Sequence, residues 1–471
     1  MELLRGVGLE DRIRALDEGR ESLILRVDTL AGTELERHSM GGHEEFGGLT
    51  PTPQVWCDQD QFEPILRARA EELGADVRFG VELVELTQDA DQVRAVVRDR
   101  GTGEERVVVA SYVLACDGAQ SPLRERAGIT LSGPGVLAHQ AGILFRADLG
   151  PALRGRTFVL CLVAPLVESS DHLNILLSRN LNRWTLSVPY DPERGEDLDP
   201  RRCTELVRAA TGLPDVAVEV LGVDRWPMRG LVSDRFRDGR VFLVGDAAHV
   251  LPPTGGFGGN SCVEDAHNIA WKLAAVLDGT AGPALLDTYE AERLPRARLL
   301  LGESLARAGL FLAGAAEGGS RQPQNHPSKA SLVLGYRYGD GPLVEDPWQP
   351  PSGPGGRAPH LTVSVAGTEI STLDLFGRGF VLLTGARDWH TAASEVTGVT
   401  PYLVGPDAEV VAPSGRWESV YGVPPGGAVL VRPDGHIAWY GGPGPDRPAQ
   451  AVRDALAAAL HTQRAAVVPV R

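Results

Sequence analysis

The chain has few cysteines, and none of the five lies in a C-x-x-C pair. Their odd number and scattered positions argue against a disulfide framework, a zinc site and dithiol redox chemistry. We interpret them as reduced residues of core or loop segments; they are Cys57, Cys116, Cys161, Cys203 and Cys262. The eleven histidines form no H-E-x-x-H or comparable ligand cluster. The sequence therefore predicts no metal site.

A long apolar run and an excess of positive charge are also absent. No stretch approaches the ~18 apolar residues of a membrane-spanning helix, and the N-terminus does not have the pattern of a signal peptide. The formal net charge of −16 disfavours a nucleic-acid backbone as a partner. These absences favour a cytoplasmic protein, and a chain of 471 residues predicts roughly two to four domains.

The most informative segment that is present covers residues 239–277. Residues 241–244 predict a buried strand, and Gly245-Asp246 follows at its carboxyl end, where α/β folds place ligands. A Pro-Pro-Thr-Gly-Gly-Phe-Gly-Gly-Asn loop comes next, and residues 264–277 predict a helix. Bare backbone and the free N–H groups of the helix start would let a ligand approach closely. A plain Gly/Pro-rich turn is the alternative for such a loop taken alone.

Two further segments carry polar residues at notable spacing. The strand expected at residues 112–116 enters Asp117-Gly118, and Ser121 and Arg124 follow at a predicted helix start. Asp-Gly is a common turn pair, so an ordinary turn is the alternative, but an arginine there can neutralise phosphate charge in a bidentate manner. Gln59 opens a helix predicted at residues 59–73 and could equally be a plain helix-start residue.

In their order and spacing these segments resemble the motifs of the class A FAD-dependent aromatic hydroxylases, the superfamily of p-hydroxybenzoate hydroxylase. Tyr-x-x-Glu-Arg-x-Pro at residues 289–295 resembles a further family motif, which is mostly structural. The resemblance implies that Asp246 bonds the ribityl or pyrophosphate region and that loop N–H groups stabilise the N1–O2 edge of reduced flavin. It implies cofactor contacts for Gln59, Asp117, Gly118, Arg124, Gly245, Asp246, Pro253, Gly255, Gly256, Gly258, Gly259 and Asn260.

The resemblance also implies an activity. NAD(P)H would reduce FAD, and the flavin C4a-hydroperoxide formed with O₂ would hydroxylate a phenolic or polycyclic polyketide ring, as in antibiotic biosynthesis. The residues assign no catalytic acid or base. We expect a small aromatic substrate and a possible homodimer; the substrate, the hydroxylation position and the choice between NADH and NADPH stay open.

One family feature is missing from the sequence. Members begin with a strand, a G-x-G-x-x-G turn and a helix that bind the ADP half of FAD, whereas no G-x-G-x-x-G follows a strand here. We therefore expect a chain that carries the isoalloxazine half of the site, through a truncation or a start codon placed late. The alternative is a non-catalytic homologue that does not retain FAD and acts as a partner or a relic.

The resemblance extends to the domain organisation, which is mixed α/β and α+β. We expect a truncated glutathione-reductase-type FAD-binding domain at residues 1–130 and 231–320, with residues 21–56 contributing strands to the substrate sheet. That sheet domain is expected at residues 131–230, a linker at 321–357, and a thioredoxin-like domain without C-x-x-C at 358–465. Within the sheet domain the possible substrate-lining residues are Arg179, Asn180, Asn182, Arg183, Trp184 and Trp226, although packing or surface roles are the better guess for any one of them.

Overall fold

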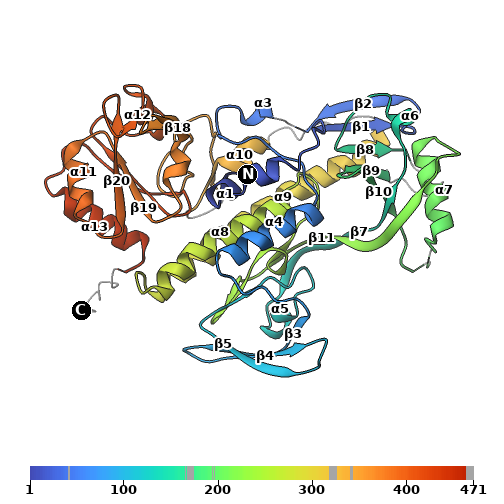
Figure 1. The fold of residues 1–471 in the computed structure, drawn as a ribbon, viewed down its shortest axis with the longest axis horizontal. Coiled ribbons are helices and arrows are strands. Elements are labelled where there is room, and N and C mark those ends of the chain that lie inside the picture. The colour runs from blue at the N-terminus through green and yellow to red at the C-terminus, as the bar shows by residue number, and fades with distance from the viewer. Residues whose placement is uncertain are drawn as a thin grey trace.

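The computed structural model describes residues 1–40, 43–164, 166, 174–193, 195, 197–317, 326–339 and 343–462. An eight-stranded sheet lies at one end of the long axis, and the seven-stranded sheet of the C-terminal unit lies at the other (Figure 1). The long helices α8 (Gly258–Leu277) and α9 (Asp287–Glu317) run between them. This multidomain arrangement of sheets and helices confirms the predicted mixed α/β class.

The largest sheet combines strands from separate parts of the chain in the order β14-β11-β7-β10-β9-β8-β1-β2. Its strands are β1 (Leu23–Val27), β2 (Glu34–Ser39), β7 (Leu131–Arg146), β8 (Leu160–Val163), β9 (Asn174–Arg179), β10 (Arg183–Pro189), β11 (Glu219–Ser233) and β14 (His249–Val250). Helices α6 (Gly150–Leu153) and α7 (Pro200–Thr211) contribute to the core on one face.

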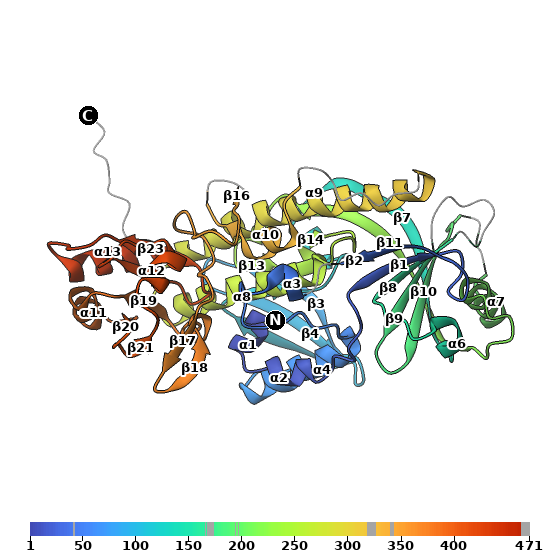
Figure 2. The same cartoon turned by 90° about the horizontal axis from the view of Figure 1, so that it is seen from above.

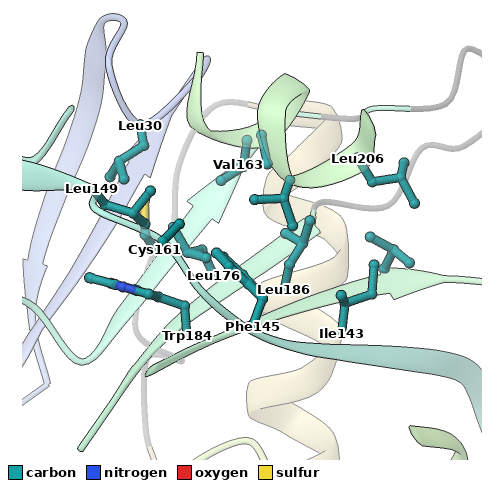
Figure 3. Close-up of a cluster of buried hydrophobic side chains, with 14 of the residues drawn as sticks. Leu30, Ile143, Phe145, Leu149, Cys161, Val163, Leu176, Trp184, Leu186 and Leu206 are labelled. Carbon is teal, nitrogen blue, oxygen red and sulfur yellow. The ribbon is translucent and has the colours of Figure 1, made fainter. Parts of the chain in front are cut away.

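That core shows which face of the sheet is filled by the protein itself. Ile143, Phe145 and Leu186 pack there with Leu206 of α7 (Figure 3). Because successive side chains of a strand point to opposite faces, the intervening residues, such as Ser187, belong to the second face. The sheet therefore has one face closed by its own helices and a second face with a different set of side chains.

A smaller sheet, in the order β12-β13-β6, positions the segments singled out in the sequence. Strand β13 (Val241–Leu243) is fully buried, pairs in parallel with β6 (Val113–Ala115) and antiparallel with β12 (Arg237–Asp238). Its residues pack with Tyr289 of α9 and Ile269 of α8. The short elements η1 (Gly245–Ala247), α5 (Pro122–Arg126) and η2 (Pro283–Leu286) connect this core to its surroundings.

The remaining elements of the first 350 residues are short, apart from one helix. Helix α4 (Gln59–Glu72) confirms the helix predicted at residues 59–73. Residues 93–99 have the pattern of a short strand in the sequence, and strand β4 (Val93–Asp99) confirms it. Strands β3 (Val81–Gln88), β4 and β5 (Glu105–Ala110) form a separate antiparallel sheet. The other elements are α1 (Glu2–Gly6), α2 (Glu10–Arg14), α3 (His43–Phe46), α10 (Lys329–Leu334), β15 (Tyr336–Arg337) and β16 (Leu343–Val344).

The C-terminal unit has the topology expected of a thioredoxin-like domain. Strands β19 (Phe380–Thr384) and β20 (Val399–Gly405) are parallel and joined through α11 (Arg387–Ser394); β22 (Ala428–Val431) and β23 (Ile437–Gly441) are antiparallel and lead to α13 (Pro448–Ala459). The sheet is extended by β17 (Thr362–Val365), β18 (Thr368–Ser371) and β21 (Val410–Val411), with η3 (Thr372–Leu375) and α12 (Arg416–Tyr421) beside it.

Some expected strands are wrong in their extent. Within residues 21–56, the sequence predicts one strand at residues 21–34, but this segment holds β1 and the start of β2, two antiparallel strands. The Asp28 carboxylate accepts the backbone N–H of Thr33 at 2.7 Å, and this bond closes the turn between them. The sequence also predicts a strand at residues 55–56, but these residues are in none. The backbone carbonyl of Trp56 accepts Arg20 Nη2 at 3.0 Å, and its indole donates to Ser22 at 2.9 Å.

Residues 77–79, where the sequence predicts a further short strand, are in no strand either. Phe79 is 74% exposed and lies beneath the guanidinium of Arg67 in α4, 4.8 Å from the ring centroid. The linker expected at residues 321–357 contains α10, β15 and β16, while residues 321–325 and 340–342 of that prediction lie outside the described residues, as do 463–465 of the predicted last domain.

Candidate cofactor site

Two turns meet at one edge of the small sheet. Leu243 of β13 is the register partner of Ala115 of β6, and the N–H of Val244 donates to the carbonyl of Ala115 at 3.0 Å. Because the two strands are parallel, the turns that follow them, which contain Asp117 and Asp246, emerge on the same side. The structure therefore brings together two motifs that are more than a hundred residues apart in the sequence.

Arg124 bridges these two turns. Its Nη1 donates to the carbonyl of Ala247 at 2.9 Å and its Nη2 to the carbonyl of Ala119 at 3.0 Å. Only 4% of the residue is exposed. Its guanidinium thus joins one turn to the other within the protein, whereas the sequence suggested a phosphate partner; a cofactor contact for Arg124 stays a prediction.

The carboxylate of Asp117 is used by its own turn. It accepts the hydroxyl of Ser121 at 2.5 Å and the backbone N–H of Leu123 at 3.0 Å. Ser121 in turn accepts the N–H of Arg124 at 3.0 Å as the N-cap of α5. Gly118 has a φ of +80°, and nothing lies within 4 Å of the position a Cβ would take, so its backbone faces open space.

Asp246 is different, because its exposed carboxylate has few partners. The bond described for it is from the thiol of Cys262, with sulfur and oxygen 3.5 Å apart. Gly245 before it has a φ of +63°, and a Cβ there would lie 3.0 Å from the Cβ and Sγ of Cys262. Glycine is thus required at this turn by both conformation and space. The turn presents a carboxylate that is available to a ligand.

The glycine loop that follows leads into α8. The helix begins at Gly258 and not at Glu264, as the sequence predicted. Phe257 explains the difference: it is 3% exposed and packs with Leu300 and Leu332, which anchors the start of the helix by a tertiary contact. Helix propensity alone disfavours a start through two glycines.

The loop presents backbone to its surroundings. Gly255 and Gly256 have φ values of +90° and +70°, and nothing lies within 4 Å of the Cβ positions of Gly256, Gly258 and Gly259. The Gly256 N–H donates to Pro253 at 3.1 Å and the Asn260 amide to Gly256 at 2.8 Å, which closes the loop on itself. The first N–H groups of the 20-residue helix α8 lie in this bare stretch. It suits a ligand with anionic or carbonyl oxygens.

Gln59 makes a local contact. It is exposed at the start of α4, where its amide nitrogen donates to Glu63 at 2.5 Å. No hydrogen bond within the described residues joins its side chain to either turn. Its predicted contact with the flavin stays a prediction.

A fully buried group behind the two turns was not predicted as functional. Asp265 of α8 accepts the N–H of Gly245 at 3.1 Å, His249 Nε2 at 2.7 Å and Arg293 Nε at 2.6 Å. Burial would raise the pKa of the Asp265 carboxyl, but the charges and hydrogen bonds of Arg293 and His249 together outweigh burial and lower it. The sequence showed Asp265 and Arg293 as parts of motifs, and their contact across 28 residues left no local signal.

Most of the possible substrate-lining residues have structural partners. Trp184 is 6% exposed and lies in the core on the closed face of the large sheet, so a substrate-lining role for it is wrong (Figure 3). Asn180 and Asp58 exchange bonds, with Asn180 N–H to Asp58 Oδ2 at 2.8 Å and Asp58 N–H to Asn180 Oδ1 at 3.1 Å. Arg183 pairs with Asp60 at 2.6 Å. These contacts join the β9–β10 turn to the start of α4.

The part of the chain that the structure describes has neither a metal-binding cluster nor a membrane-spanning helix. It holds no group of three or more histidine, cysteine, aspartate or glutamate residues placed to bind a metal ion. None of its helices combines the length and apolar content needed to span a membrane.

Comparison with known proteins gives consistent matches over nearly the whole chain. Residues 1–304 match the family model described as FAD binding domain, and residues 352–462 match that described as aromatic-ring hydroxylase, C-terminal. The 4-methyl-5-nitrocatechol 5-monooxygenase of a Burkholderia species is 40% identical, with 98% of this chain and 89% of the relative covered. Tetracenomycin A2 monooxygenase-dioxygenase of Streptomyces glaucescens is 36% identical, with 97% and 87% covered.

Solved structures agree with these relatives. The ternary complex of aklavinone-11 hydroxylase with FAD and aklavinone has a TM-score of 0.87 at 35% identity, covering 98% of this chain and 90% of that chain. The complex of the flavin-dependent monooxygenase PieE with FAD and substrate has a TM-score of 0.86 at 30% identity, covering 98% and 91%.

Proposed function

The chain belongs to the FAD-dependent aromatic-ring hydroxylases and is a flavin-dependent monooxygenase, and from this premise we propose that it uses NAD(P)H and O₂ to hydroxylate an electron-rich phenolic ring. The names of the relatives support this, since one is a nitrocatechol monooxygenase and others are named for tetracenomycins and aklavinone. A catechol or a polycyclic polyketide phenol is therefore the proposed substrate class.

The observation that carries the proposal is that the turns containing Asp117 and Asp246 meet beside the glycine-rich start of α8. Gly256, Gly258 and Gly259 leave room for a ligand to contact backbone, and these residues fit a group with acceptor oxygens. We propose that the N–H groups of Gly258 and Gly259 hold the pyrimidine edge of the flavin, and that the exposed carboxylate of Asp246 holds the ribityl or pyrophosphate region. FAD, when bound, supplies the redox and oxygen-transfer chemistry.

The other predicted contacts remain part of the proposal. Pro253 is exposed in the loop and would stiffen it near the reacting atoms. Arg124 would act by fixing the spacing of the two turns, since its guanidinium is bonded to both. No side chain is assigned as a general acid or base.

The large sheet supports a place for the substrate. Strand β14 follows the Asp246 turn after one residue and pairs with β11 at the edge of that sheet. The second face of the sheet, which α6 and α7 do not cover, carries apolar residues such as Ile175 beside polar ones such as Ser187. We propose that an aromatic substrate lies against this face, with its ring toward the loop.

Two wider aspects belong to the same proposal. The domain division predicted from the sequence, with FAD-binding, sheet, linker and thioredoxin-like parts, is retained, and the C-terminal unit is proposed to support a homodimer. The alternative of a non-catalytic homologue receives less support, because the relatives matched over nearly their whole length are monooxygenases.

The test begins with cofactor retention. The purified chain should be yellow or become so on incubation with FAD, and Asp246→Ala should retain far less flavin. Asp278→Ala is the matched control, because Asp278 is an exposed carboxylate at the opposite end of α8. A protein that gains no flavin, or an Asp246→Ala variant with unchanged flavin content, would contradict the assigned site.

The second part of the test is turnover. With 4-nitrocatechol or a dihydroxyanthraquinone as probe, NADH or NADPH oxidation should depend on FAD, and the product should gain one oxygen atom from ¹⁸O₂. Oxidation of NAD(P)H without incorporation of oxygen into either probe would contradict the proposed substrate class.

A further inference from the structure

The turn between β22 and β23 of the C-terminal unit is packed into the helices behind the two turns of the candidate site. Arg432 in this turn donates to both carboxylate oxygens of Glu292 in α9, at 2.5 and 3.0 Å. His436 stacks on Tyr338, which follows β15, with ring centroids 4.4 Å apart and planes tilted by 33°. The C-terminal unit therefore contacts the central helices through specific side chains.

These contacts include buried charges that stabilise one another. Asp434 accepts Trp271 Nε1 of α8 at 3.0 Å, and Lys272 donates to Glu292 at 2.7 Å. Burial would raise the pKa of the Asp434 carboxyl, but the charges and hydrogen bonds of Arg432 and His436 together outweigh burial and lower it. A cluster of buried ions tolerates little displacement, because a lost partner leaves a charge unpaired. The turn is held in one position against α8 and α9.

Tyr338 connects the β22–β23 turn to Arg293. The Nη1 of Arg293 donates to the hydroxyl oxygen of Tyr338 at 3.2 Å. The same guanidinium donates Nε to Asp265 at 2.6 Å and Nη2 to the carbonyl of Ser261 at 3.2 Å. Arg293 is 1% exposed, and its planar fork fixes the relative directions of these three partners.

Asp265 connects this group to the turn of the proposed cofactor site. Its Oδ2 accepts the N–H of Gly245 at 3.1 Å and His249 Nε2 at 2.7 Å, one residue before and three residues after Asp246. The carboxylate thus holds Gly245–Ala247 from both sides. A continuous series of contacts between buried or half-buried side chains runs from the C-terminal unit to the backbone that presents Asp246.

We propose that His436 and Tyr338 are positioning residues for the Gly245–Ala247 turn, acting through Arg293 and Asp265. The C-terminal unit is then a component that sets the geometry of the cofactor site. This inference rests on the proposed function in taking the turn to bind FAD. The positioning itself is a property of the folded chain and is measurable without cofactor.

The test uses single-group substitutions in the full chain. Tyr338→Phe removes the hydroxyl bonded to Arg293 and keeps the ring, and Tyr336→Phe is its matched control, since no hydrogen bond within the described residues is made by that hydroxyl. His436→Ala removes the stacked ring from a position in the C-terminal unit, and His436→Phe restores a ring. The primary measurement is amide hydrogen exchange at residues 245–247, with residues 117–121 as the internal reference.

We expect Tyr338→Phe and His436→Ala to accelerate exchange at residues 245–247, with little change at 117–121 or in the melting temperature. His436→Phe should return the exchange toward the wild-type rate, and Tyr336→Phe should leave it unchanged. FAD titration followed by flavin fluorescence should show about tenfold weaker binding for Tyr338→Phe, the loss expected for one hydrogen bond to a charged group.

Unchanged exchange at residues 245–247 in both Tyr338→Phe and His436→Ala would overturn the proposal. If only one variant folds, the exchange in that variant decides. Accelerated exchange together with no FAD binding to any version, wild type included, would support the positioning and refute the cofactor assignment. Wild-type exchange rates at residues 245–247 in both variants, together with wild-type FAD affinity, would refute the positioning and leave the cofactor assignment supported.

Discussion

The two turns of the candidate site have the same local plan and different uses of their carboxylates. Each follows a parallel strand and places an aspartate beside a glycine. Asp117 is bonded to Ser121 and Leu123 and stabilises the start of a five-residue helix, whereas Asp246 is exposed with only the thiol of Cys262 as a described partner. The difference shows that a strand–aspartate–turn pattern identifies a place in the fold, and that the local hydrogen bonds decide whether the carboxylate is free for a ligand.

Removing the carboxylate behind the Asp246 turn should have the largest effect. Asp265→Ala leaves Arg293 without its buried partner, and the free energy of unfolding should fall by about 3–5 kcal/mol. Asp278→Ala, on the same helix but exposed, is the control. Urea denaturation of both variants measures the difference; equal stabilities would show that Asp265 does not support the turn.

Removing the guanidinium of Arg124, which bridges the two turns, should have the second largest effect. Arg124→Met removes the bonds to the carbonyls of Ala119 and Ala247. Because both carbonyls lose a charged donor, the free energy of unfolding should fall by about 2–3 kcal/mol. Arg126→Met on the same helix, whose guanidinium is exposed, should cost less. Hydrogen exchange should rise at both turns in Arg124→Met. A rise at one turn alone would mean that the arginine does not bridge them.

The comparison predicts opposite phenotypes for the two aspartates. Asp117→Ala removes the acceptor of the Ser121 hydroxyl and of the Leu123 N–H at the start of α5 and should lower the free energy of unfolding by about 1–2 kcal/mol, with FAD binding reduced only to the extent that the turn loosens. Glu125→Ala, an exposed carboxylate of the same helix, controls for charge. Denaturant melts and FAD titration are the measurements. A stable Asp117→Ala protein that has lost FAD would reverse the roles assigned to the two turns.

Moderate acidification should change the free energy of unfolding least. The pKa of Asp265 and the pKa of Glu292 would be raised by burial, but both are lowered by the charges of Arg293 and Arg432, respectively. A carboxyl whose pKa is lower in the folded state contributes stability above its unfolded pKa and loses it as the pH falls through the folded value. The stability that these two carboxyls contribute should therefore change little from pH 7 to about pH 5 and fall below about pH 4. Any loss just below the ordinary histidine pKa belongs to His267 and His360, because burial lowers the pKa of each. A marked loss between pH 7 and pH 6 would point to other groups.

Local patterns allowed much of the fold to be predicted. Strand β4 and helix α4 were predicted almost to the residue, because alternation and helical spacing leave a direct signal in the sequence. The start of α8 was missed, since two glycines give no helix signal and the buried Phe257 supplies the stabilising contact. The turns at residues 117 and 245 were predicted as a pair.

The internal partners of the site could not be predicted in the same way. Spacing located Arg124 beside the Asp117 turn, but the direction of its guanidinium depends on where β13 lies. The contact of Asp265 with Arg293 and that of Tyr338 with His436 join residues 28 and 98 positions apart. Such contacts depend on how the elements pack, which no local pattern in a single sequence records.

Helix α9 has a mechanical consequence. Its 31 residues correspond to about 46 Å at 1.5 Å per residue. It holds Arg293 near one end and extends toward the large sheet at the other (Figure 2). Between these ends it packs against β11 of the large sheet, where Leu301 and Leu305 lie 3.2 and 3.3 Å from the position that a Cβ of Gly230 would take. The helix therefore ties the buried ions around Glu292 and Arg293 to the large sheet, so a shift at either place is resisted at the other.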